Sequence, residues 1–290
     1  LAQGFAVLAR ILPQHGVGAI AVEEPGSTGA REQLRTWGVE TPPVRVDGRG
    51  LIVEDLERSG ARAVLVTPAH HYPTGVVLAP ERRRELLAWA RAADDRYIIE
   101  DDYDAEYRYD SSPVGSLQPF DSERVISGSS VSKTLAPGLR LGWLVLPPAL
   151  VESAVRLKAA FDLGTQVLSQ AVFAEFLRSG GFDRHLRTSR TRYRRQRARL
   201  AARLAASAPG LHVTGLDAGL SLCIRAELAD DQAAADELKM AGVACEALSY
   251  YQQRPDPQRG MVLDINASSE RELDLVIAAI KDARGSPPAA

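Results

Sequence analysis

The stretch ISGSSVSKTLAPGLRLGW, residues 126–143, places Lys133 in a Ser- and Gly-rich turn between two apolar runs. The chain has only four lysines, and the other three lie in segments with helical patterning and polar faces. An exposed helical lysine can be replaced by arginine, which this sequence uses freely. Arginine cannot lose its proton in a protein, whereas lysine can become an amine nucleophile. The position of Lys133 therefore predicts a chemical role.

The composition is that of an ordinary globular protein. Its 290 residues suit one large domain or two medium ones, and 45% of them are hydrophobic and 25% charged. A net charge of −2 gives no reason to expect that the chain as a whole binds nucleic acid or membranes. Cys223 and Cys245 form no close-spaced metal motif. We interpret them as reduced core residues of a cytoplasmic protein, with a disulfide left open as the alternative.

The two ends of the chain carry further signals. No apolar run reaches the length of a membrane span, and no signal peptide is recognisable. The first residues, LAQGFAVLARIL, show a helical pattern without an initiating methionine, so we expect an N-terminally incomplete sequence. The tail GSPPAA, residues 285–290, is predicted to be disordered.

Short apolar segments alternate with helical patterns in the first half of the chain. Strands are predicted at 18–24, 61–68, 97–103, 124–129 and 139–147, with helices at 30–37 and from Pro80 through 93. This alternation predicts an α/β fold whose largely parallel sheet is covered by helices on both faces. Ligands of such sheets bind at the carboxyl ends of the strands. His70, His71, Asp101, Tyr103 and the turn 130–133 fall at these ends.

The pattern changes after Pro147. Helices are predicted over 148–177 and 182–206, followed by strands at HVTG and LSLCIRA, a helix over 231–240, a strand at VLDIN and a helix over 269–283. This order predicts a smaller α+β domain. We place the large domain at residues 1–175 and the small one at 176–284.

The strand-end residues suit one cofactor in particular. Lys133 can form an imine with an aldehyde, and the Asp101 carboxylate can keep a pyridine nitrogen protonated. Tyr103, two residues further on, can donate to a phenolic oxygen. Ser130, Ser132 and Arg140 can hold a phosphate through hydroxyl donors and a fixed cation. Together these groups are what pyridoxal phosphate requires of its protein.

The same motifs resemble those of a known family. TPAHHYPTG is similar to TPSHQFPTG, IIEDDYDAEYRYD to IIEDDYDSEFRYD, and SVSKTLAPGLRLGWLVLPP to FSKTLAPGLRLGYLVLP, all from the aminotransferase-like domain of MocR-type regulators in the GntR superfamily. The resemblance covers nearly the whole chain in the same order. It implies the fold of the fold-type I, pyridoxal-phosphate-dependent aminotransferases, with a sheet of the seven-stranded type.

The resemblance also implies roles for individual residues. Lys133 corresponds to the lysine that forms the internal aldimine, Asp101 to the partner of the pyridine nitrogen and Tyr103 to the partner of the ring oxygen. Ser130, Ser132 and Arg140 correspond to residues at the phosphate. His71 stands where the family usually has glutamine, and we count it among the cofactor-binding residues. The resemblance further implies a homodimer that binds a small amine or amino acid.

Several positions depart from the family pattern. Pro25-Gly26-Ser27 replaces Pro-Gly-Tyr, so the aromatic ring expected against the cofactor is missing, and Gly29 stands where some relatives have a carboxylate-binding arginine. Ser249-Tyr250-Tyr251 replaces Ser-Arg-Tyr, whose arginine binds a ligand carboxylate; Arg254 and Arg259 are the candidate substitutes. The family's Ser-Gly-x-Gln phosphate turn would precede Leu1, with at most Gln3 left of it. The covalent centre is thus complete, while ring stacking and ligand recognition are altered.

Two other motifs admit different interpretations. Ser130-Val131-Ser132-Lys133 fits the S-x-x-K motif of penicillin-binding enzymes, but S-D-N and K-T-G companions are absent. The run RHLRTSRTRYRRQRARLAAR, residues 184–203, offers arginine on every face of one helix and could follow nucleic-acid phosphates. We favour a solvated helix for this run.

Two functions from different classes remain open. The first is a transaminase acting on an amino acid or amine, with Lys133 as the general base. The second is the effector-sensing part of a regulator, or a degenerate domain, in which ligand exchange at Lys133 shifts a conformational equilibrium. DNA binding in the family belongs to an N-terminal winged helix that these 290 residues do not contain.

Overall fold

The computed structural model describes residues 1–104, 106–109, 115–207, 211–215, 218–254, 257–265 and 269–285. The helices are α1 (Ala2–Ile11), α2 (Thr28–Thr36), α3 (Val53–Ser59), α4 (Pro80–Arg91), α5 (Pro148–Asp162), α6 (Val167–Arg178), α7 (Gly181–Ser207), α8 (Asp231–Met240) and α9 (Glu270–Gly285). The strands are β1 (Ile20–Glu24), β2 (Pro43–Asp47), β3 (Gly50–Leu51), β4 (Ala63–Val66), β5 (Tyr97–Asp102), β6 (Val125–Ser130), β7 (Gly142–Val145), β8 (His212–Thr214), β9 (Ser221–Arg225), β10 (Cys245–Ala247) and β11 (Gly260–Asp264). Within these residues no helix is both long and apolar enough to cross a bilayer.

The first half of the chain forms a seven-stranded sheet in the order β3-β2-β1-β4-β5-β6-β7. Strands β2, β1, β4, β5 and β6 run parallel, and β3 and β7 are antiparallel to their neighbours. Strand β4 is a continuous buried run because a parallel strand is covered on both faces. The hairpin of β2 and β3 and the helix α3 were not predicted. The predicted strand 139–147 is shorter, since Pro137–Leu139 form a 3-10 turn before β7.

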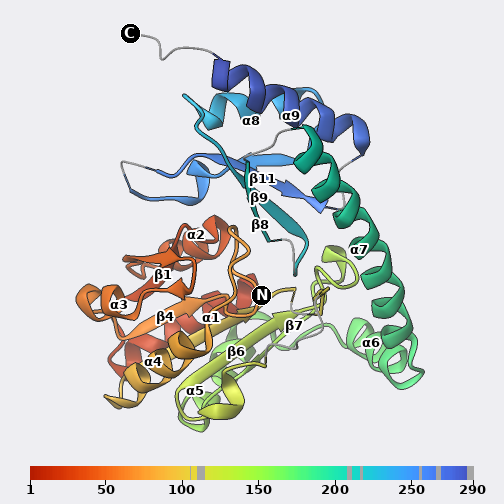
Figure 1. Ribbon diagram of the computed structural model, residues 1–290. Helices are drawn as coiled ribbons and strands as arrows, with labels where there is room; N and C mark the ends of the chain where they lie inside the picture. The colour runs from red at the N-terminus through yellow and green to blue at the C-terminus, as the bar shows by residue number, and fades with distance from the viewer. Residues whose placement is uncertain are drawn as a thin grey trace.

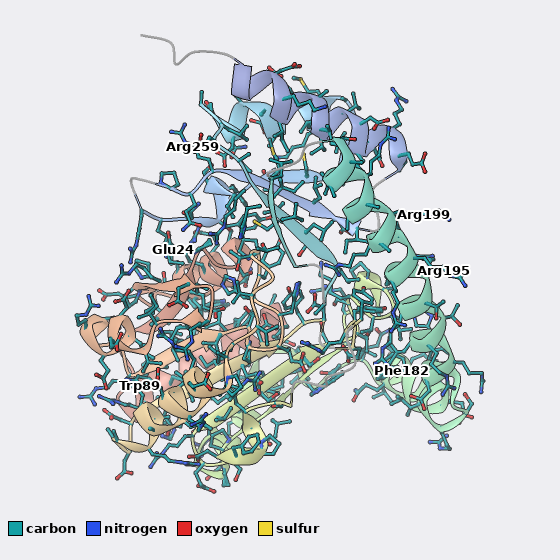
Figure 2. The ribbon with its side chains drawn as sticks, in the orientation of Figure 1. Glu24, Trp89, Phe182, Arg195, Arg199 and Arg259 are labelled. Carbon is teal, nitrogen blue, oxygen red and sulfur yellow. The ribbon has the colours of Figure 1, made fainter. Side chains whose placement is uncertain are left out.

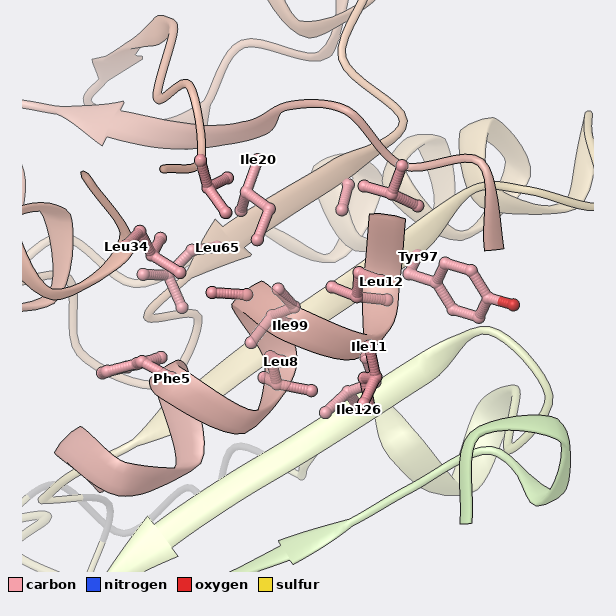
Figure 3. Close-up of a cluster of buried hydrophobic side chains, with 14 of the residues drawn as sticks. Phe5, Leu8, Ile11, Leu12, Ile20, Leu34, Leu65, Tyr97, Ile99 and Ile126 are labelled. Atoms are coloured by element: carbon pink, nitrogen blue, oxygen red, sulfur yellow. The ribbon is translucent and has the colours of Figure 1, made fainter. Parts of the chain in front are cut away.

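Helices cover both faces of this sheet (Figure 1). On one face α1 lies across the strands, and Figure 3 shows Phe5, Leu8, Ile11 and Leu12 directed at strand residues that include Ile99. Helices α2 and α5 complete that layer. The opposite core contains α3 and α4, with Trp89 buried beneath the α4 surface (Figure 2). The large sheet therefore has the doubly covered arrangement predicted from the sequence.

The second half forms a four-stranded antiparallel sheet in the order β10-β11-β9-β8. Helices α7, α8 and α9 pack on its outer face, and α7 runs along the side of the molecule (Figure 1). Helix α8 begins at Asp230, whose side chain accepts the backbone N–H groups of Gln232 and Ala233 and so caps the helix. The three-residue strand β10 was not predicted. Cys223 and Cys245 are buried and free.

Specific contacts join the two sheets. The backbone N–H of Leu220, just before β9, donates to Asp104 Oδ2, just after β5, at 3.2 Å. A Cβ on Gly75 would lie 2.2 Å from the Cα of Gly215, so the two backbones touch. Glu24, at the boundary in Figure 2, accepts the backbone N–H of Arg254 at 3.2 Å. These contacts hold the small sheet above the carboxyl ends of the large one.

The domain division remains a prediction. Its predicted boundary at residues 175 and 176 lies inside α6 (Val167–Arg178). Phe182 of α7 packs edge-on against Phe173 and Phe176 of α6, so the two helices form one unit at this point (Figure 2). At the other end, Gly285 of the predicted tail closes α9, and residues 286–290 lie outside the described residues.

Candidate functional site

A cavity of about 570 Å³ lies between the two sheets. Its floor is formed at the carboxyl ends of parallel strands, where Thr67 follows β4, Asp101 is the last but one residue of β5 and Lys133 follows β6. Strand order changes direction between β1 and β4, and such a switch point is where ligands bind in open α/β sheets. The remaining described lining residues are Ser27, Thr28, Gly29, Tyr72, Tyr103, Leu220, Ser221, Ala244, Cys245, Glu246, Tyr250, Tyr251, Val262 and Asp264.

Lys133 lies in the tight turn after β6. The backbone N–H of Leu135 donates to the carbonyl of Val131 at 2.9 Å and closes this turn. A Cβ on Gly142 would lie 2.9 Å from the Ser129 carbonyl oxygen, so glycine is what allows β7 to return this closely. Lys133 is exposed and lines the cavity, and it makes no hydrogen bond or ion pair with any described residue. Its amine is therefore available to a ligand.

Asp101 lies next to last in β5, paired in register with Gly128 of β6. The side chain keeps partial exposure toward the cavity, yet the surrounding protein removes most of its hydration. This desolvation raises the pKa of Asp101 to about 7. A cationic group beside it would stabilise the ionised form, so Asp101 suits a protonated ring nitrogen.

Tyr103 is held by a buried pair of polar side chains. His70 Nδ1 lies 2.9 Å from the Tyr103 hydroxyl and 3.1 Å from Asp104 Oδ2. Asp104 Oδ2 also accepts the backbone N–H of Leu220 at 3.2 Å. Burial raises the pKa of the Tyr103 phenol well above its usual value. The Tyr103 phenol therefore stays protonated and directed at the cavity. His70 and Asp104 connect this phenol to the small sheet.

His71 lies behind the cavity and does not line it. Its Nδ1 lies 2.6 Å from the Thr74 hydroxyl, and its Nε2 lies 3.6 Å from Glu23 Oε2. Glu23 in turn accepts the backbone N–H and the hydroxyl of Thr67. Burial lowers the pKa of His71 to about 3 and raises that of Glu23 to about 8, so both are neutral near pH 7. The predicted cofactor contact of His71 stays a prediction.

The predicted phosphate residues lie along the same turn but not on the cavity. Ser130 is the buried last residue of β6, and Ser132 is half-buried in the turn. Arg140 is exposed, has a φ of 51° and donates through Nη1 to the Pro137 carbonyl at 3.3 Å. It lines a neighbouring cavity of about 730 Å³ beside β7. The serine of the S-x-x-K alternative thus ends a strand rather than starting a helix, which removes the context that this alternative requires.

Aromatic residues that were not predicted as site residues line the cavity. The ring centroids of Tyr72 and Tyr251 are 5.2 Å apart, those of Tyr72 and Tyr103 5.8 Å, and those of Tyr250 and Tyr251 5.4 Å. Tyr72 follows the predicted His70-His71 turn. Tyr250 and Tyr251 were noted only as departures from the family motif. Tyr72 lies far from Tyr250 and Tyr251 in the sequence, so the sequence gave no signal that these side chains would be in contact.

The candidate carboxylate-binding arginines lie elsewhere. Arg259 donates to the carbonyls of Leu228 and Ala229 and lies at the outer edge of the small sheet (Figure 2). The charge of Arg254 acts on Asp55, where it helps to lower the pKa of that carboxyl after the larger effect of Arg45. Among the described residues that line the cavity there is no arginine.

The arginine-rich run forms α7, as predicted, and its members differ in environment. Arg197 is buried over the Tyr109 ring, at 4.9 Å from the centroid, and Arg190 donates to the carbonyl of Glu106. Arg195 and Arg199 extend into solvent (Figure 2). One side of the helix is therefore structural and the other is a solvated face.

Comparison with known proteins agrees with this architecture. Residues 2–280 match the family model described as aminotransferase class I and II. The HTH-type transcriptional regulator YhdI of Bacillus subtilis is 31% identical over 91% of this chain and 57% of its own length. The probable rhizopine catabolism regulatory protein MocR of Rhizobium meliloti is 35% identical over 89% of this chain and 52% of its own length. The chain spans about half the length of these relatives.

A solved structure shows the same fold. Kynurenine aminotransferase of Pyrococcus horikoshii, in complex with PMP, superposes with a TM-score of 0.86 at 24% identity, covering 98% of this chain and 74% of that one. This superposition confirms the predicted fold-type I architecture. The two regulators confirm the predicted resemblance to MocR-type regulators. The family supports pyridoxal phosphate as the cofactor, as predicted.

Proposed function

The chain belongs to the aminotransferase class I and II family, and on that premise we propose that it is a pyridoxal-phosphate-binding domain that receives a small amine at Lys133. The observation that carries this proposal is the convergence of Lys133, Asp101 and Tyr103 on one cavity. Each comes from a different position at the carboxyl edge of the sheet, and each has the chemistry that the cofactor requires.

The residues present fit the cofactor. Lys133 offers an exposed amine without a competing partner among the described residues. Asp101 offers a carboxyl whose burial favours pairing with a cation, and Tyr103 offers a phenol held by His70 at 2.9 Å. The phosphate would be held by the turn 130–133 and by Arg140, which lines the neighbouring cavity beside β7 and whose guanidinium has five N–H donors. Only the Nη1 contact to Pro137 ties these donors to the described residues.

Each residue then has a defined task. Pyridoxal phosphate supplies an aldehyde for the amine and a ring that draws electrons from the neighbouring carbon. Asp101 would hold the proton on the ring nitrogen, and Tyr103 would donate to the ring oxygen. Lys133 would hold the aldehyde end of the cofactor through Nζ, and its free amine would be the base that moves a proton.

The test is chemical labelling. We would add pyridoxal phosphate to the chain, reduce with borohydride and locate the added mass among the peptides. The expected result is a modified Lys133 peptide, visible absorbance before reduction, and neither in Lys133→Ala. Lys158→Ala, which alters a half-buried lysine of α5 paired with Asp162, is the matched control and should label normally. Equal labelling of wild type and Lys133→Ala would overturn the proposal.

A second candidate, ligand sensing, is favoured by the relatives. One is named an HTH-type transcriptional regulator and the other a catabolism regulatory protein, and this chain corresponds to about half of each. In this candidate function, exchange of an amine at Lys133 shifts the arrangement of the two sheets. DNA is bound by a part of the regulator that this chain does not match. Amino-group transfer to a keto acid would support the enzyme. A cofactor spectrum that responds to an amine without any transfer would support the sensor.

A homodimer belongs to the same proposal. Helices α5 and α6 and the segment between them expose apolar side chains, among them Val155 (62% exposed), Leu163 (96%) and Val167 (76%). A monomer seldom leaves such a surface open. Sedimentation analysis should give about twice the mass of one chain, 31.3 kDa. The two free, buried cysteines suit the cytoplasmic location that the sequence predicted.

A further inference from the structure

The far wall of the cavity belongs to the small sheet and carries two acids. Glu246 of β10 pairs in register with Val262 of β11, and Asp264 lies two residues beyond Val262. Alternate residues of a strand share a face. Glu246, Val262 and Asp264 therefore lie on one face of the small sheet, and all three line the cavity.

The carboxylate of Glu246 is held in place from outside the cavity. Lys239 Nζ contacts Glu246 Oε1 at 2.5 Å, and the backbone N–H of Ala247 donates to the same oxygen. Lys239 is not among the residues that line the cavity. These contacts fix the orientation of Glu246 and involve only one of its two oxygens in the described part of the chain.

Tyrosines surround the space beside these acids. Tyr72, Tyr250 and Tyr251 form two edge-to-face pairs, with centroid distances of 5.2 and 5.4 Å. Burial raises the pKa of Tyr72, and the charges of Asp264 and Glu246 add to this effect, so the field of both acids reaches the tyrosines. Aromatic faces and carboxylates both attract an ammonium group.

The positive charge on the cavity wall comes from Lys133 alone among the described lining residues. A ligand carboxylate would meet Asp264 and Glu246, of which Lys239 pairs only one Glu246 oxygen from outside the cavity, with no arginine among the described lining residues. Placing a charge against like charges in a partly dry site is costly. A second ammonium group on the ligand would meet two carboxylates and the tyrosine rings. The cavity thus has the chemistry of a cation site at the end away from the large sheet.

We propose that this cavity selects an amine that carries a second positive charge at its far end, of the diamine or polyamine class. One amino group faces Lys133, and the other lies between Glu246, Asp264 and the tyrosines. This assignment of the ligand rests on the proposed function, because that function places the reactive amine at Lys133.

The test compares three four-carbon ligands that differ only at the far end: 1,4-diaminobutane, 1-aminobutane and 4-aminobutanoate. Binding to the chain without added cofactor is measured by titration calorimetry. We expect the diamine to bind about tenfold more tightly than 1-aminobutane, and 4-aminobutanoate to bind most weakly. Equal affinities, or a preference for 4-aminobutanoate, would overturn the inference.

Variants assign the preference to the acids. Glu246→Gln with Asp264→Asn should bring the diamine to within about threefold of 1-aminobutane, whose affinity should not change. Glu237→Gln, an exposed acid of α8 outside the cavity, is the matched control and should keep the full preference. A full preference in the double variant would refute the role of the acids. If the double variant does not fold, as judged by circular dichroism, the ligand series on the unaltered chain still decides.

The two proposals fail in different ways. Diamine selectivity without any cofactor adduct at Lys133 would overturn the proposed function and leave the cation site in place. An adduct at Lys133 together with equal binding of the three ligands would keep the proposed function and remove the cation site.

Discussion

The phenolic oxygens of Tyr72 and Tyr251 lie 2.8 Å apart and form a hydrogen bond between the two sheets. Tyr72 belongs to the turn after β4, and Tyr251 ends a 3-10 turn after β10. Their rings meet edge to face, with Tyr251 only 6% exposed. This bond closes one side of the cavity, so ligand recognition and the association of the two sheets share the same residues.

Removing one hydroxyl of this pair should cost more than removing both. Tyr72→Phe leaves the Tyr251 hydroxyl buried without its partner, and we expect the free energy of unfolding to fall by about 1–2 kcal/mol. Tyr72→Phe combined with Tyr251→Phe should cost no more than one single change. Urea unfolding of the four proteins measures the coupling. Strictly additive losses would show that the bond contributes nothing.

Glu23 should make stability depend on pH. Burial raises its pKa from 4.5 to about 8, so the folded chain keeps the proton over a range in which the unfolded chain has lost it. The contribution is fully present below pH 4.5 and is lost as pH rises through 8. Glu23→Gln can still accept from Thr67 and does not titrate. We expect the melting temperature of wild type minus that of Glu23→Gln to fall between pH 4.5 and 8. A constant difference would contradict the assignment.

Arg197 should be one of the costliest arginines to replace. Its two bonds to Gly219 and Ser221 are buried, and Arg197→Gln would leave both carbonyls poorly paired. We expect a loss of about 3 kcal/mol in the free energy of unfolding. Arg199→Gln, an exposed change on the same helix, should cost less than about 0.5 kcal/mol. Similar losses in the two variants would mean that α7 is held by other contacts.

Gly219 should tolerate no side chain. Its φ is +74°, and a Cβ there would lie 2.0 Å from Cε1 of the buried His70 ring. Gly242 has a φ of +86° with nothing within 4 Å of the added atom. Gly242→Ala should therefore cost only the backbone strain, about 1–2 kcal/mol, and Gly219→Ala should cost clearly more. Thermal unfolding compares them. Equal losses of stability in the two variants would show that the His70 ring moves away from the added Cβ at little cost in free energy.

The floor of the site was largely predictable from the sequence. Asp101 lies near the end of one strong apolar strand and Lys133 follows another. The carboxyl ends of parallel strands meet at one edge, so local patterns placed these residues together. The position of Arg140 was less predictable. Its backbone adopts φ 51° after a 3-10 turn, which directs the residue to the neighbouring cavity.

The far wall of the cavity, which belongs to the small sheet, could not be predicted in the same way. Strand β10 has three residues, too few to show a period of two, and Glu246 there resembles any solvated acid. Asp264 faces the cavity only because β11 pairs with β10 in one register. The partnership of Tyr72 and Tyr251 likewise depends on how the small sheet sits on the large one. Long-range packing decides these positions, and a single sequence carries no local trace of it.

The floor of the cavity belongs to the large sheet and its far wall to the small one. A molecule bound between them touches both, so the free energy of its binding is shared by the entire chain. We therefore expect calorimetry to resolve separate melting steps for the two sheets without a ligand and one cooperative step with it. Ligand occupancy of the cavity would then be measurable as a change from two melting steps to one.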